Sequence, residues 1–220
     1  AGSSSGTTNG IGSNAKLSRP FGITMSSDDT YCLIADSNNN QIRKIVISTQ
    51  QVSLLAGGGS FANNVTGYSN GIGTNALFHS PYDLHISSDA TYCLIADTNN
   101  NQIRQLIIST QQVTLLAGSP SRTAGSVNGI GSNAMFYDPY GVSISMTGTY
   151  ALVCEFTNNL IRKIILTTAA VSLIAGGGSI GTASGSVNGI ATNALFYQPV
   201  GISFSWDGSY CLIADSNNNQ

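Results

Sequence analysis

Apolar and polar residues alternate in short blocks along the chain, and these blocks return at regular intervals. The run YCLIADSNNNQIRK, from Tyr31 to Lys44, comes back as YCLIADTNNNQIRQ from Tyr92 and as ALVCEFTNNLIRK from Ala151, and it begins again at Tyr210. An apolar run of strand length, an acidic residue, an Asn-rich turn and a second β-branched run are typical of a β-hairpin. The pattern therefore predicts a repeat protein.

Four copies of an Asn-Gly-Ile motif set the length of the repeat. Their asparagines are 61, 58 and 60 residues apart, at Asn9, Asn70, Asn128 and Asn188. Four prolines, at Pro20, Pro81, Pro139 and Pro199, keep the same intervals. Each repeat thus spans about 60 residues. Within one domain we place four repeats, each with its leading loop, at 1–57, 58–118, 119–176 and 177–220.

Each complete repeat carries four strand candidates after its proline. The first alternates apolar and small polar residues at a period of two, as in FGITMS and YGVSIS. The other three, YCLIAD, IRKIVIS and VSLLAG in the first repeat, are apolar at nearly every position, so both faces of their sheet must be covered. The fold class predicted is all-β, a β-propeller of four-stranded antiparallel blades. Between the blades we expect apolar packing by Ile42, Ile45, Leu54 and Leu55.

The loop before each proline is short and rich in Gly, Ser and Asn. In the second repeat it reads NGIGTNALF, which is long enough for one turn of helix. No segment between Pro20 and Gly57 has the i, i+3, i+4 spacing of a longer helix.

These motifs together resemble a known family. The order P-x-G-[IV], Y-x-L-I-A-D, N-N-x-x-I-R-K-I and V-x-L-[LI]-A-G, preceded by N-G-[IV]-G-x-N-A-x-F, is similar to the NHL-repeat β-propellers and extends over essentially the whole chain. The resemblance implies a propeller, commonly six-bladed, that binds proteins, peptides or nucleic acids. A minority of such relatives act as lyases or hydrolases.

The number of blades departs from that of a closed ring. The fourth repeat shows its first two strands, so the chain holds about three and a half blades. We expect the chain to be a fragment of a longer one, and the alternative is that blades from several chains assemble.

Composition narrows the class of partner. Charged residues make up 8% of the chain and the net charge is -2, against about 25% charged residues in ordinary soluble domains. The eight basic residues are scattered, which argues against binding to nucleic acid or anionic membrane. No apolar run reaches the roughly 18 residues of a membrane helix. We expect an extracellular or cell-surface protein.

Cysteines and a sequon add two smaller expectations. Cys32, Cys93 and Cys211 share one position of the repeat, and equivalent residues of stacked sheets stand about 10 Å apart, beyond the reach of a disulfide. We expect these three and Cys154 to be buried free thiols. The sequon that begins at Asn64 lies in a Gly/Ser/Asn loop, and chance explains it in a chain this rich in Asn and Thr.

One acidic and one basic position recur seven residues apart. The acidic residues are Asp36, Asp97, Glu155 and Asp215, and the basic ones are Arg43, Arg104 and Arg162. A carboxylate at a strand end accepts hydrogen bonds from the turn or pairs with that arginine. Because the pair is present in every complete repeat, we interpret it as structural rather than catalytic.

The second repeat departs from the pattern with His79, Asp83 and His85. Asp83 and His85 are two positions apart on the innermost strand, so they share one face. A His/Asp cluster is a weak candidate for a metal site, but the other repeats offer no further ligand. We therefore expect no metal and no cofactor, and interpret these residues as drift of the repeat.

Asn-rich turns and aromatic residues beside the prolines form a candidate binding rim. Its members are Phe21, Tyr82, Tyr140, Asn38 and Asn99. Aromatic faces with amide groups suit sugars or peptides. The alternative is that Asn serves left-handed turn geometry while the aromatic rings pack beneath the loop.

The sequence as a whole predicts a non-enzymatic extracellular module, a scaffold for protein–protein assembly or adhesion within a larger surface or secreted protein. Its expected partners are proteins or other copies or blades of the same protein, with glycans as a further class. The alternatives are a lyase- or hydrolase-type propeller enzyme and a carbohydrate-binding propeller. The regular repeat favours the scaffold, since an active site in a propeller usually breaks the repeat.

Overall fold

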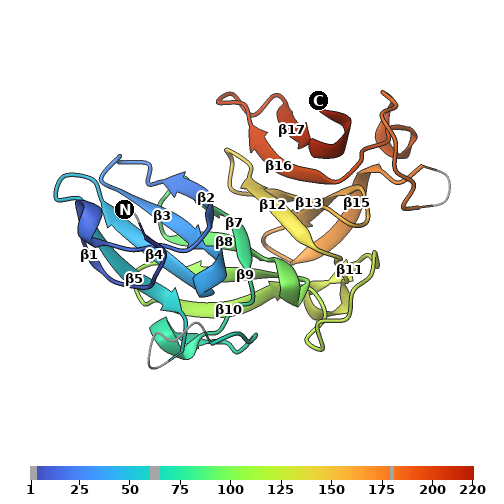
Figure 1. The fold of residues 1–220 in the computed structure, drawn as a ribbon. Coiled ribbons are helices and arrows are strands. Elements are labelled where there is room, and N and C mark those ends of the chain that lie inside the picture. The colour runs from blue at the N-terminus through green and yellow to red at the C-terminus, as the bar shows by residue number, and fades with distance from the viewer. Residues whose placement is uncertain (1–3, 60–64, 179–180) are drawn as a thin grey trace. The chain divides into compact units, whose positions relative to one another are not determined.

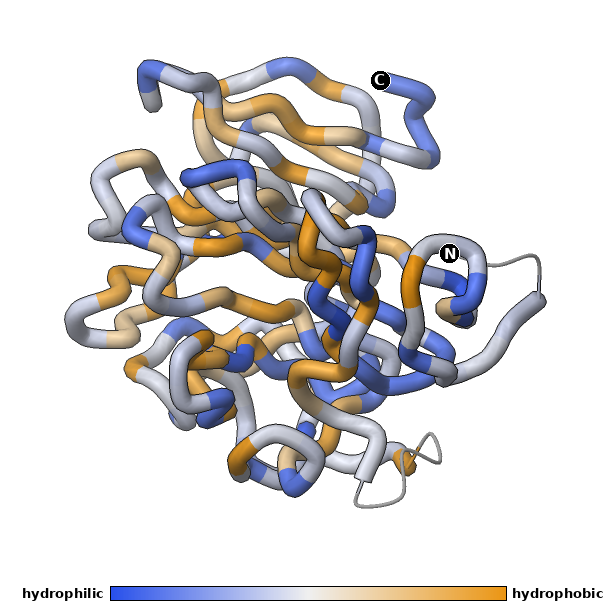
Figure 2. Tube along the Cα trace, turned by 90° about the vertical axis from the view of Figure 1, so that its left-hand side faces the viewer, coloured by the Kyte–Doolittle hydropathy of each residue, from blue (hydrophilic) through white to orange (hydrophobic). Residues whose placement is uncertain are grey.

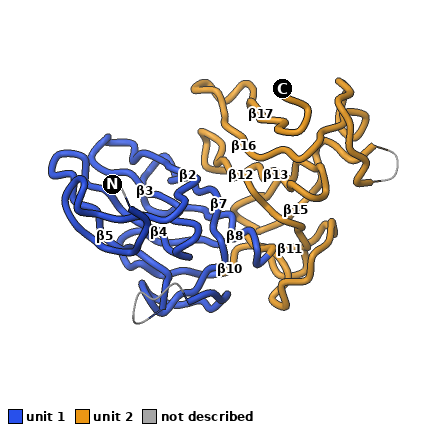
Figure 3. The backbone as a smooth tube through the Cα atoms, viewed as in Figure 1, with its two compact units in different colours: residues 1–100, 104–114 blue, residues 101–103, 115–220 orange. Residues whose placement is uncertain are grey.

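The computed structural model describes residues 4–59, 65–178 and 181–220 as antiparallel sheets joined by short turns (Figure 1). Figure 2 shows hydrophobic residues along the strands and hydrophilic ones at many of the turns. The chain divides into two compact units, 1–100 with 104–114 and 101–103 with 115–220 (Figure 3). The helices of the described residues are single turns, and none has the length and apolarity to cross a membrane.

The first repeat forms a five-stranded antiparallel sheet in the order β1-β5-β4-β3-β2. The strands are β1 (Gly10–Ile11), β2 (Pro20–Met25), β3 (Tyr31–Asp36), β4 (Gln41–Val46) and β5 (Gln51–Gly57). The four predicted strands are all present. The additional strand, β1, comes from the Asn-Gly-Ile motif, whose two paired residues are too few to produce a strand pattern in the sequence.

The second and third repeats have the same strand order, β6-β10-β9-β8-β7 and β11-β15-β14-β13-β12. The second contains β6 (Gly71–Ile72), β7 (Pro81–Ile86), β8 (Tyr92–Asp97), β9 (Gln102–Ile107) and β10 (Gln112–Ala117). The third contains β11 (Gly129–Ile130), β12 (Pro139–Ile144), β13 (Tyr150–Glu155), β14 (Leu160–Ile165) and β15 (Ala170–Gly176). In the fourth, β16 (Pro199–Phe204) pairs with β17 (Cys211–Asp215).

Single 3-10 turns lie at two positions of the repeat. Those after the Asn-Gly-Ile motif, where one helical turn was predicted, are η1 (Gly12–Asn14), η3 (Gly73–Asn75), η5 (Gly131–Asn133) and η6 (Ala191–Asn193). Those in the Asn-rich turn are η2 (Ser37–Asn39), η4 (Thr98–Asn100) and η7 (Ser216–Asn218). In the third repeat the turn between β13 and β14 contains no such helix.

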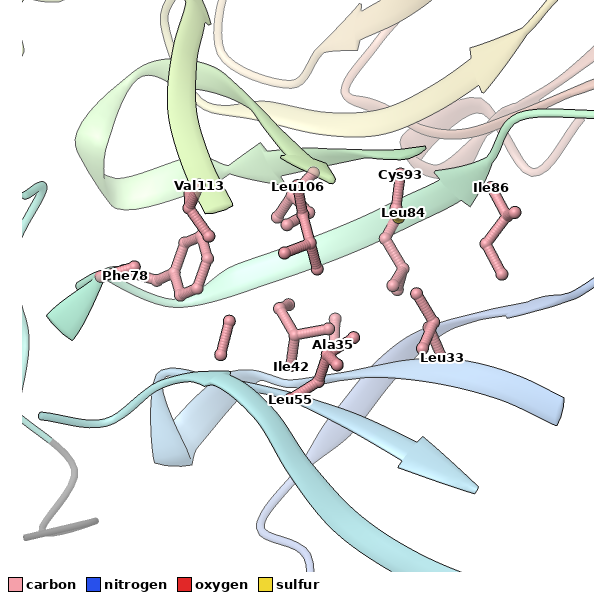
Figure 4. Packing of buried hydrophobic residues seen from close by; sticks show 13 residues of the cluster. Leu33, Ala35, Ile42, Leu55, Phe78, Leu84, Ile86, Cys93, Leu106 and Val113 are labelled. Atoms are coloured by element: carbon pink, nitrogen blue, oxygen red, sulfur yellow. The ribbon is translucent and has the colours of Figure 1, made fainter. Parts of the chain in front are cut away.

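Apolar side chains of the first and second sheets form one core in the first unit (Figure 4). Ile42 is fully buried and Leu55 is 7% exposed, and both belong to this core, as predicted. The prediction was wrong for Ile45 and Leu54, which are half-buried. Ile45 occupies the position of the buried Leu106 but lacks a covering sheet, while Leu54 lies on a strand whose outer neighbour is only two residues long.

The four cysteines are free thiols, as expected, and Cys32, Cys93 and Cys154 are buried while Cys211 is half-buried. In the second unit, Cys154 belongs to a separate core with Leu152, Ile161 and Ile202. Its Sγ lies 3.6 Å from the carbonyl oxygen of Gly201. Each thiol thus behaves as a small apolar side chain.

A buried arginine holds the leading loop of the first repeat against its sheet. Arg43 Nη1 lies 3.1 Å from Asp36 Oδ2, and both side chains are fully buried. Nη2 donates to Asn9 Oδ1 at 2.6 Å and to the Thr8 carbonyl at 3.3 Å. Nη1 also donates to the carbonyl of Lys16 at 3.2 Å. One guanidinium therefore joins the β3–β4 hairpin to loop acceptors that lie 27 to 35 residues earlier.

The other complete repeats contain the same network. The Nη1 atoms of Arg104 and Arg162 lie 3.1 and 2.7 Å from the acidic residues seven positions earlier, Asp97 and Glu155. Their Nη2 atoms donate to the loop asparagines 34 positions earlier, at 2.8 Å to Asn70 and 2.7 Å to Asn128.

Each acidic residue also accepts hydrogen bonds that do not involve arginine. Asp36 accepts from the Ser18 backbone N–H at 2.7 Å and from Asn39 Nδ2 at 2.8 Å. In the fourth repeat, Asp215 accepts at 2.7 Å from both the Tyr197 backbone N–H and Asn218 Nδ2. The carboxylate thereby fixes the turn and the start of the first strand together.

Burial shifts the titration of these carboxyl groups. It raises the pKa of Asp97 to about 6 and that of Glu155 to about 7, because the charged form loses its hydration. The paired arginine, the turn asparagine and the backbone N–H oppose the shift without cancelling it. Burial likewise raises the pKa of Asp36.

We predict that Arg104→Met lowers the free energy of unfolding by about 3–5 kcal/mol, because it leaves a buried carboxylate and several loop acceptors without their donor. Urea denaturation of the chain measures the loss. The matched control is Arg19→Met, since Arg19 is exposed and its guanidinium lies 5.0 Å from the Phe21 ring centroid. That variant should lose less than about 1 kcal/mol, and equal losses in the two variants would contradict the network's role.

A second prediction concerns pH. A carboxyl whose pKa is higher in the folded chain stabilises the fold below its unfolded pKa, and this contribution disappears as the pH rises through the folded value. For Glu155 the window runs from the ordinary pKa of 4.5 to about 7. Glu155→Gln should therefore flatten the fall in unfolding free energy across this window, as measured by urea titrations at several pH values.

The control for the pH prediction is Asp207→Asn. Side-chain and backbone donors from Ser205 and Ser209 lower the pKa of the exposed Asp207 from 3.8 to about 2. Its stabilising contribution is present above pH 3.8 and disappears as the pH falls through about 2. Asp207→Asn should thus change the pH profile only at the acid end, and a change of slope between pH 4.5 and 7 like that of Glu155→Gln would refute the assignment.

Candidate functional site

Two of the predicted rim residues come together in the first unit. The rings of Phe21 and Tyr82 are stacked with centroids 4.3 Å apart, and they belong to the adjacent inner strands β2 and β7. Phe21 is 46% exposed and Tyr82 is half-buried. The Arg19 guanidinium lies over the Phe21 ring, at 5.0 Å from the ring centroid. The pair therefore forms an aromatic platform with one cation, accessible from solvent.

The predicted amides, Asn38 and Asn99, are exposed beside the same strand starts. The backbone N–H of Asn38 donates to the Ser18 carbonyl at 3.1 Å, two residues before Pro20. Asn99 makes the equivalent bond to the His79 carbonyl, and its Nδ2 donates to Ser80 Oγ at 3.2 Å. Phe21, Tyr82, Arg19, Asn38 and Asn99 make up what we call the aromatic rim of the first unit.

The third predicted ring lies in the second unit with a different neighbour. Tyr140 stacks on Phe156 with centroids 4.5 Å apart. Phe156 was not among the predicted residues, although it stands where the other repeats have Ser37, Thr98 and Ser216. That replacement of a small hydroxyl residue by an aromatic one was the signal in the sequence.

The remaining asparagines of the turns have structural partners. Asn39 Nδ2 donates to Asp36 and, at 2.7 Å, to the Gly6 carbonyl. Asn40 adopts a left-handed conformation, with φ of 53°, and its Oδ1 accepts from the Ser80 backbone N–H of the next repeat at 2.8 Å. Both are buried. Of the three consecutive asparagines, only the first is presented to solvent.

The second-repeat residues that interrupt the pattern do not gather into a metal site. The His79 backbone N–H donates to Asp97 Oδ1 at 2.8 Å, as the corresponding residue does in the first repeat. Asp83 lies so close to Gly22 of the adjacent inner strand that a Cβ built there would be 2.6 Å from Asp83 Oδ1. Across residues 4–59, 65–178 and 181–220, no three His, Cys, Asp or Glu side chains come close enough to hold a metal ion.

His85 is half-buried on β7, and its burial lowers its pKa below the ordinary value of 6.5. Such a histidine is neutral at pH 7. It resembles a tolerated core residue more than a ligand, although it shares a strand face with Asp83 as predicted. The sequon residue Asn64 lies outside the described residues.

The chemistry available at the aromatic rim is recognition. An exposed ring pair offers an apolar face, the arginine offers a charge and a planar group, and the amides donate and accept hydrogen bonds. These groups suit a peptide segment or a sugar.

Comparison with known proteins supports the repeat assignment. No family model matches the chain. Human NHL repeat-containing protein 2 is 36% identical over 111 residues, which is 50% of this chain and 15% of that protein. The chloroplastic protein SUPPRESSOR OF QUENCHING 1 of Arabidopsis thaliana is 32% identical over 153 residues, or 68% of this chain and 14% of that protein. The chain thus spans only about one-seventh of these relatives.

Solved structures share the fold at low sequence identity. A Bacteroides thetaiotaomicron protein of unknown function matches with a TM-score of 0.72 and 18% identity over 92% of this chain and 46% of its own. A chain from the nidogen/laminin complex matches with a TM-score of 0.63 and 10% identity, over 92% of this chain and 59% of its own.

The relatives named NHL repeat-containing protein 2 support the repeat assignment, and the sheets have the propeller-blade strand order that the resemblance implied. The predicted four-stranded blade gains a short fifth strand, and the fold class is otherwise confirmed. The chain belongs to the NHL-repeat family of β-propeller proteins.

Proposed function

We propose that this chain is a non-enzymatic extracellular scaffold that binds a peptide segment of a partner protein at the aromatic rim. The observation that carries the proposal is the stacked and solvent-accessible pair Phe21–Tyr82 with Arg19 over it. Aromatic residues and arginine are the residue types that dominate binding energy at protein interfaces.

The buried polar groups of each repeat and the exposed polar groups of the aromatic rim have different roles, and this difference supports a binding role over a catalytic one. The acidic and basic positions that recur in the complete repeats, Asp97 and Arg104 among them, form hydrogen bonds that hold a loop against a sheet. The exposed polar groups of the aromatic rim are amides and one guanidinium, which recognise ligands rather than transfer protons.

The extracellular location is supported by composition. With 8% charged residues, the chain relies on Ser, Thr, Asn and Gly for its polar exterior. A propeller chain of the same fold occurs in a complex of nidogen and laminin, and we extend that kind of use, assembly with another protein, to this chain.

Peptides that bind the aromatic rim can be selected from a random displayed library on the immobilised chain. We predict that Phe21→Ala weakens the binding of these peptides by at least about tenfold, because loss of an aromatic anchor costs about 2 kcal/mol or more. Fluorescence anisotropy of the selected peptides measures the change. Ile130→Ala is the control, because Ile130 is 62% exposed on β11 and lies outside the aromatic rim. That variant should bind as tightly as the parent chain.

Other outcomes would favour the alternatives. Failure to select any peptide, together with glycan-array binding that Phe21→Ala abolishes, would replace the scaffold with a lectin. Stoichiometric zinc or calcium in the purified protein, lost on His79→Ala or His85→Ala, would favour a metal-dependent enzyme.

A further inference from the structure

The third repeat differs from the others at two positions that lie next to each other in space. Asp138 stands directly before the proline, where the other repeats have Arg19, Ser80 and Gln198. Phe156 begins the Asn-rich turn, where the other repeats have a small hydroxyl residue. The Phe156 backbone N–H donates to the Asp138 carbonyl at 3.0 Å. The carboxylate and the added ring therefore belong to one local structure.

The backbone at Asp138 has the conformation that every repeat adopts before its proline. Its φ is 49°, and the equivalent residues have values of 51°, 50° and 57°. Left-handed backbone of this kind is uncommon for a residue with a side chain. Asn101 holds it, since its Oδ1 accepts from the Asp138 backbone N–H at 2.9 Å. The scaffold thus fixes where this side chain begins, while its chemistry differs from repeat to repeat.

The fold does not need a charge at this position. Thr157 Oγ1 donates to Asp138 Oδ2 at 2.6 Å, but in the second repeat the neutral pair Asn99 and Ser80 makes the equivalent contact at 3.2 Å. Across residues 4–59, 65–178 and 181–220, Asp138 forms no ion pair and its Oδ1 accepts no hydrogen bond. One carboxylate oxygen of a half-buried residue is therefore available to a ligand.

Two ring faces lie beside this carboxylate. The rings of Tyr140 and Phe156 are stacked with centroids 4.5 Å apart and an interplanar angle of 17°. The face of an aromatic ring is negative and attracts a cation, as a carboxylate does. Whereas Phe21 has Arg19 over its ring, no lysine or arginine of the described residues lies over Phe156. The ring pair and Asp138 thus favour the same kind of ligand.

The access of solvent to these groups does not depend on the ends of the sequence. In the chain, the second repeat precedes the third and the fourth follows it. Thr157 is nevertheless exposed, and Asp138, Tyr140 and Phe156 are half-buried. Tyr137, directly before the carboxylate, is 40% exposed. We call Asp138, Tyr140, Phe156 and Thr157 the acidic rim of the second unit.

We propose that the acidic rim binds the side chain of a lysine or arginine in a segment of a partner protein. The cation pairs with Asp138 Oδ1 and lies against the exposed part of the ring pair, whose apolar surface packs on the methylene stem. Thr157 occupies Oδ2, so the site offers one oxygen, which suits an ammonium as well as a single guanidinium N–H. Phosphate groups of nucleic acids or lipids have the wrong sign for this site.

The specificity differs from that of the aromatic rim of the first unit. There a guanidinium, that of Arg19, lies over the ring pair and favours an acidic group. Here the ring pair has a carboxylate beside it. The chain therefore carries two aromatic sites of opposite charge preference, and each can be tested without the other.

The first experiment titrates the 220-residue chain with Nα-acetyl-lysine amide and follows the ring resonances of Tyr140 and Phe156 by NMR. Saturable shifts are expected with a Kd on the order of 10 mM, as for a single side chain, and added salt should weaken them. Nα-acetyl-norleucine amide has a similar apolar stem without the charge. It should bind at least about threefold more weakly.

Two variants test the residues. Asp138→Asn keeps an acceptor for Thr157 but removes the charge, and Phe156→Ser installs the residue that the first and fourth repeats have. Each should weaken binding of the lysine probe by at least about threefold. Asp138→Asn should leave binding of the norleucine probe unchanged. Unaltered thermal unfolding would show that both variants keep the fold.

Two control variants locate the binding. Asp207→Asn removes another exposed carboxylate of the second unit, and Phe21→Ala disrupts the aromatic rim of the first unit, so both should bind the lysine probe like the parent chain. The proposal is overturned by an absence of saturable shifts, by equal binding of the two probes, or by a loss in either control as large as that of Asp138→Asn. None of these results bears on peptide binding at the aromatic rim.

Discussion

A guanidinium with no access to water sits inside each complete blade, and its desolvation has to be balanced by hydrogen bonds of good geometry. Arg43 shows how most of this balance is met, because one carboxylate and three loop acceptors surround its two terminal nitrogens, while its buried Nε has no hydrogen-bond partner among the described residues. The requirement works in both directions. The loop is held because the arginine needs acceptors, and the arginine is tolerated because the loop supplies them.

The same constraint explains the bulge found opposite the arginine. The pairing of β4 with β5 shifts between Ile42 and Arg43, and that of β14 with β15 shifts at the equivalent place. A bulge lets one strand bend and re-aim a side chain. Here the displaced residue is Leu55, which turns into the core while the guanidinium reaches the loop.

Sequence reasoning could find the hairpins and the acid–arginine pairs, since both are local and regular. It missed the loop acceptors, because Asn9 and Arg43 are 34 residues apart and an Asn-Gly-Ile motif looks like any turn. The signal was nevertheless present. The interval from loop asparagine to arginine is 34 in all three complete repeats, while the repeat length itself varies between 58 and 61 residues.

The candidate site, too, could be predicted in part from the sequence. That the residues beside the prolines are aromatic was readable from the sequence, whereas the stacking partner of each ring depends on which strands lie side by side. Tyr82 meets Phe21 of the preceding repeat, but Tyr140 meets Phe156 of its own repeat. Exposure of Asn38 and burial of Asn39, adjacent residues of one type, follow from the 3-10 turn that directs them differently.

The left-handed Asn40, whose side chain accepts from the Ser80 backbone of the following repeat, bears on how such a gene can change in length. The Oδ1 atom of Asn159 accepts the same bond from the Gln198 backbone N–H. The asparagine that ends the hairpin of the first or third repeat thus supplies an acceptor for the backbone of the next repeat. Duplication or deletion of whole repeats by unequal recombination preserves these junctions, whichever repeat is copied. An exchange at equivalent points of two repeats also keeps one asparagine and one arginine at the 34-residue spacing, so the hybrid repeat retains both partners of the buried network.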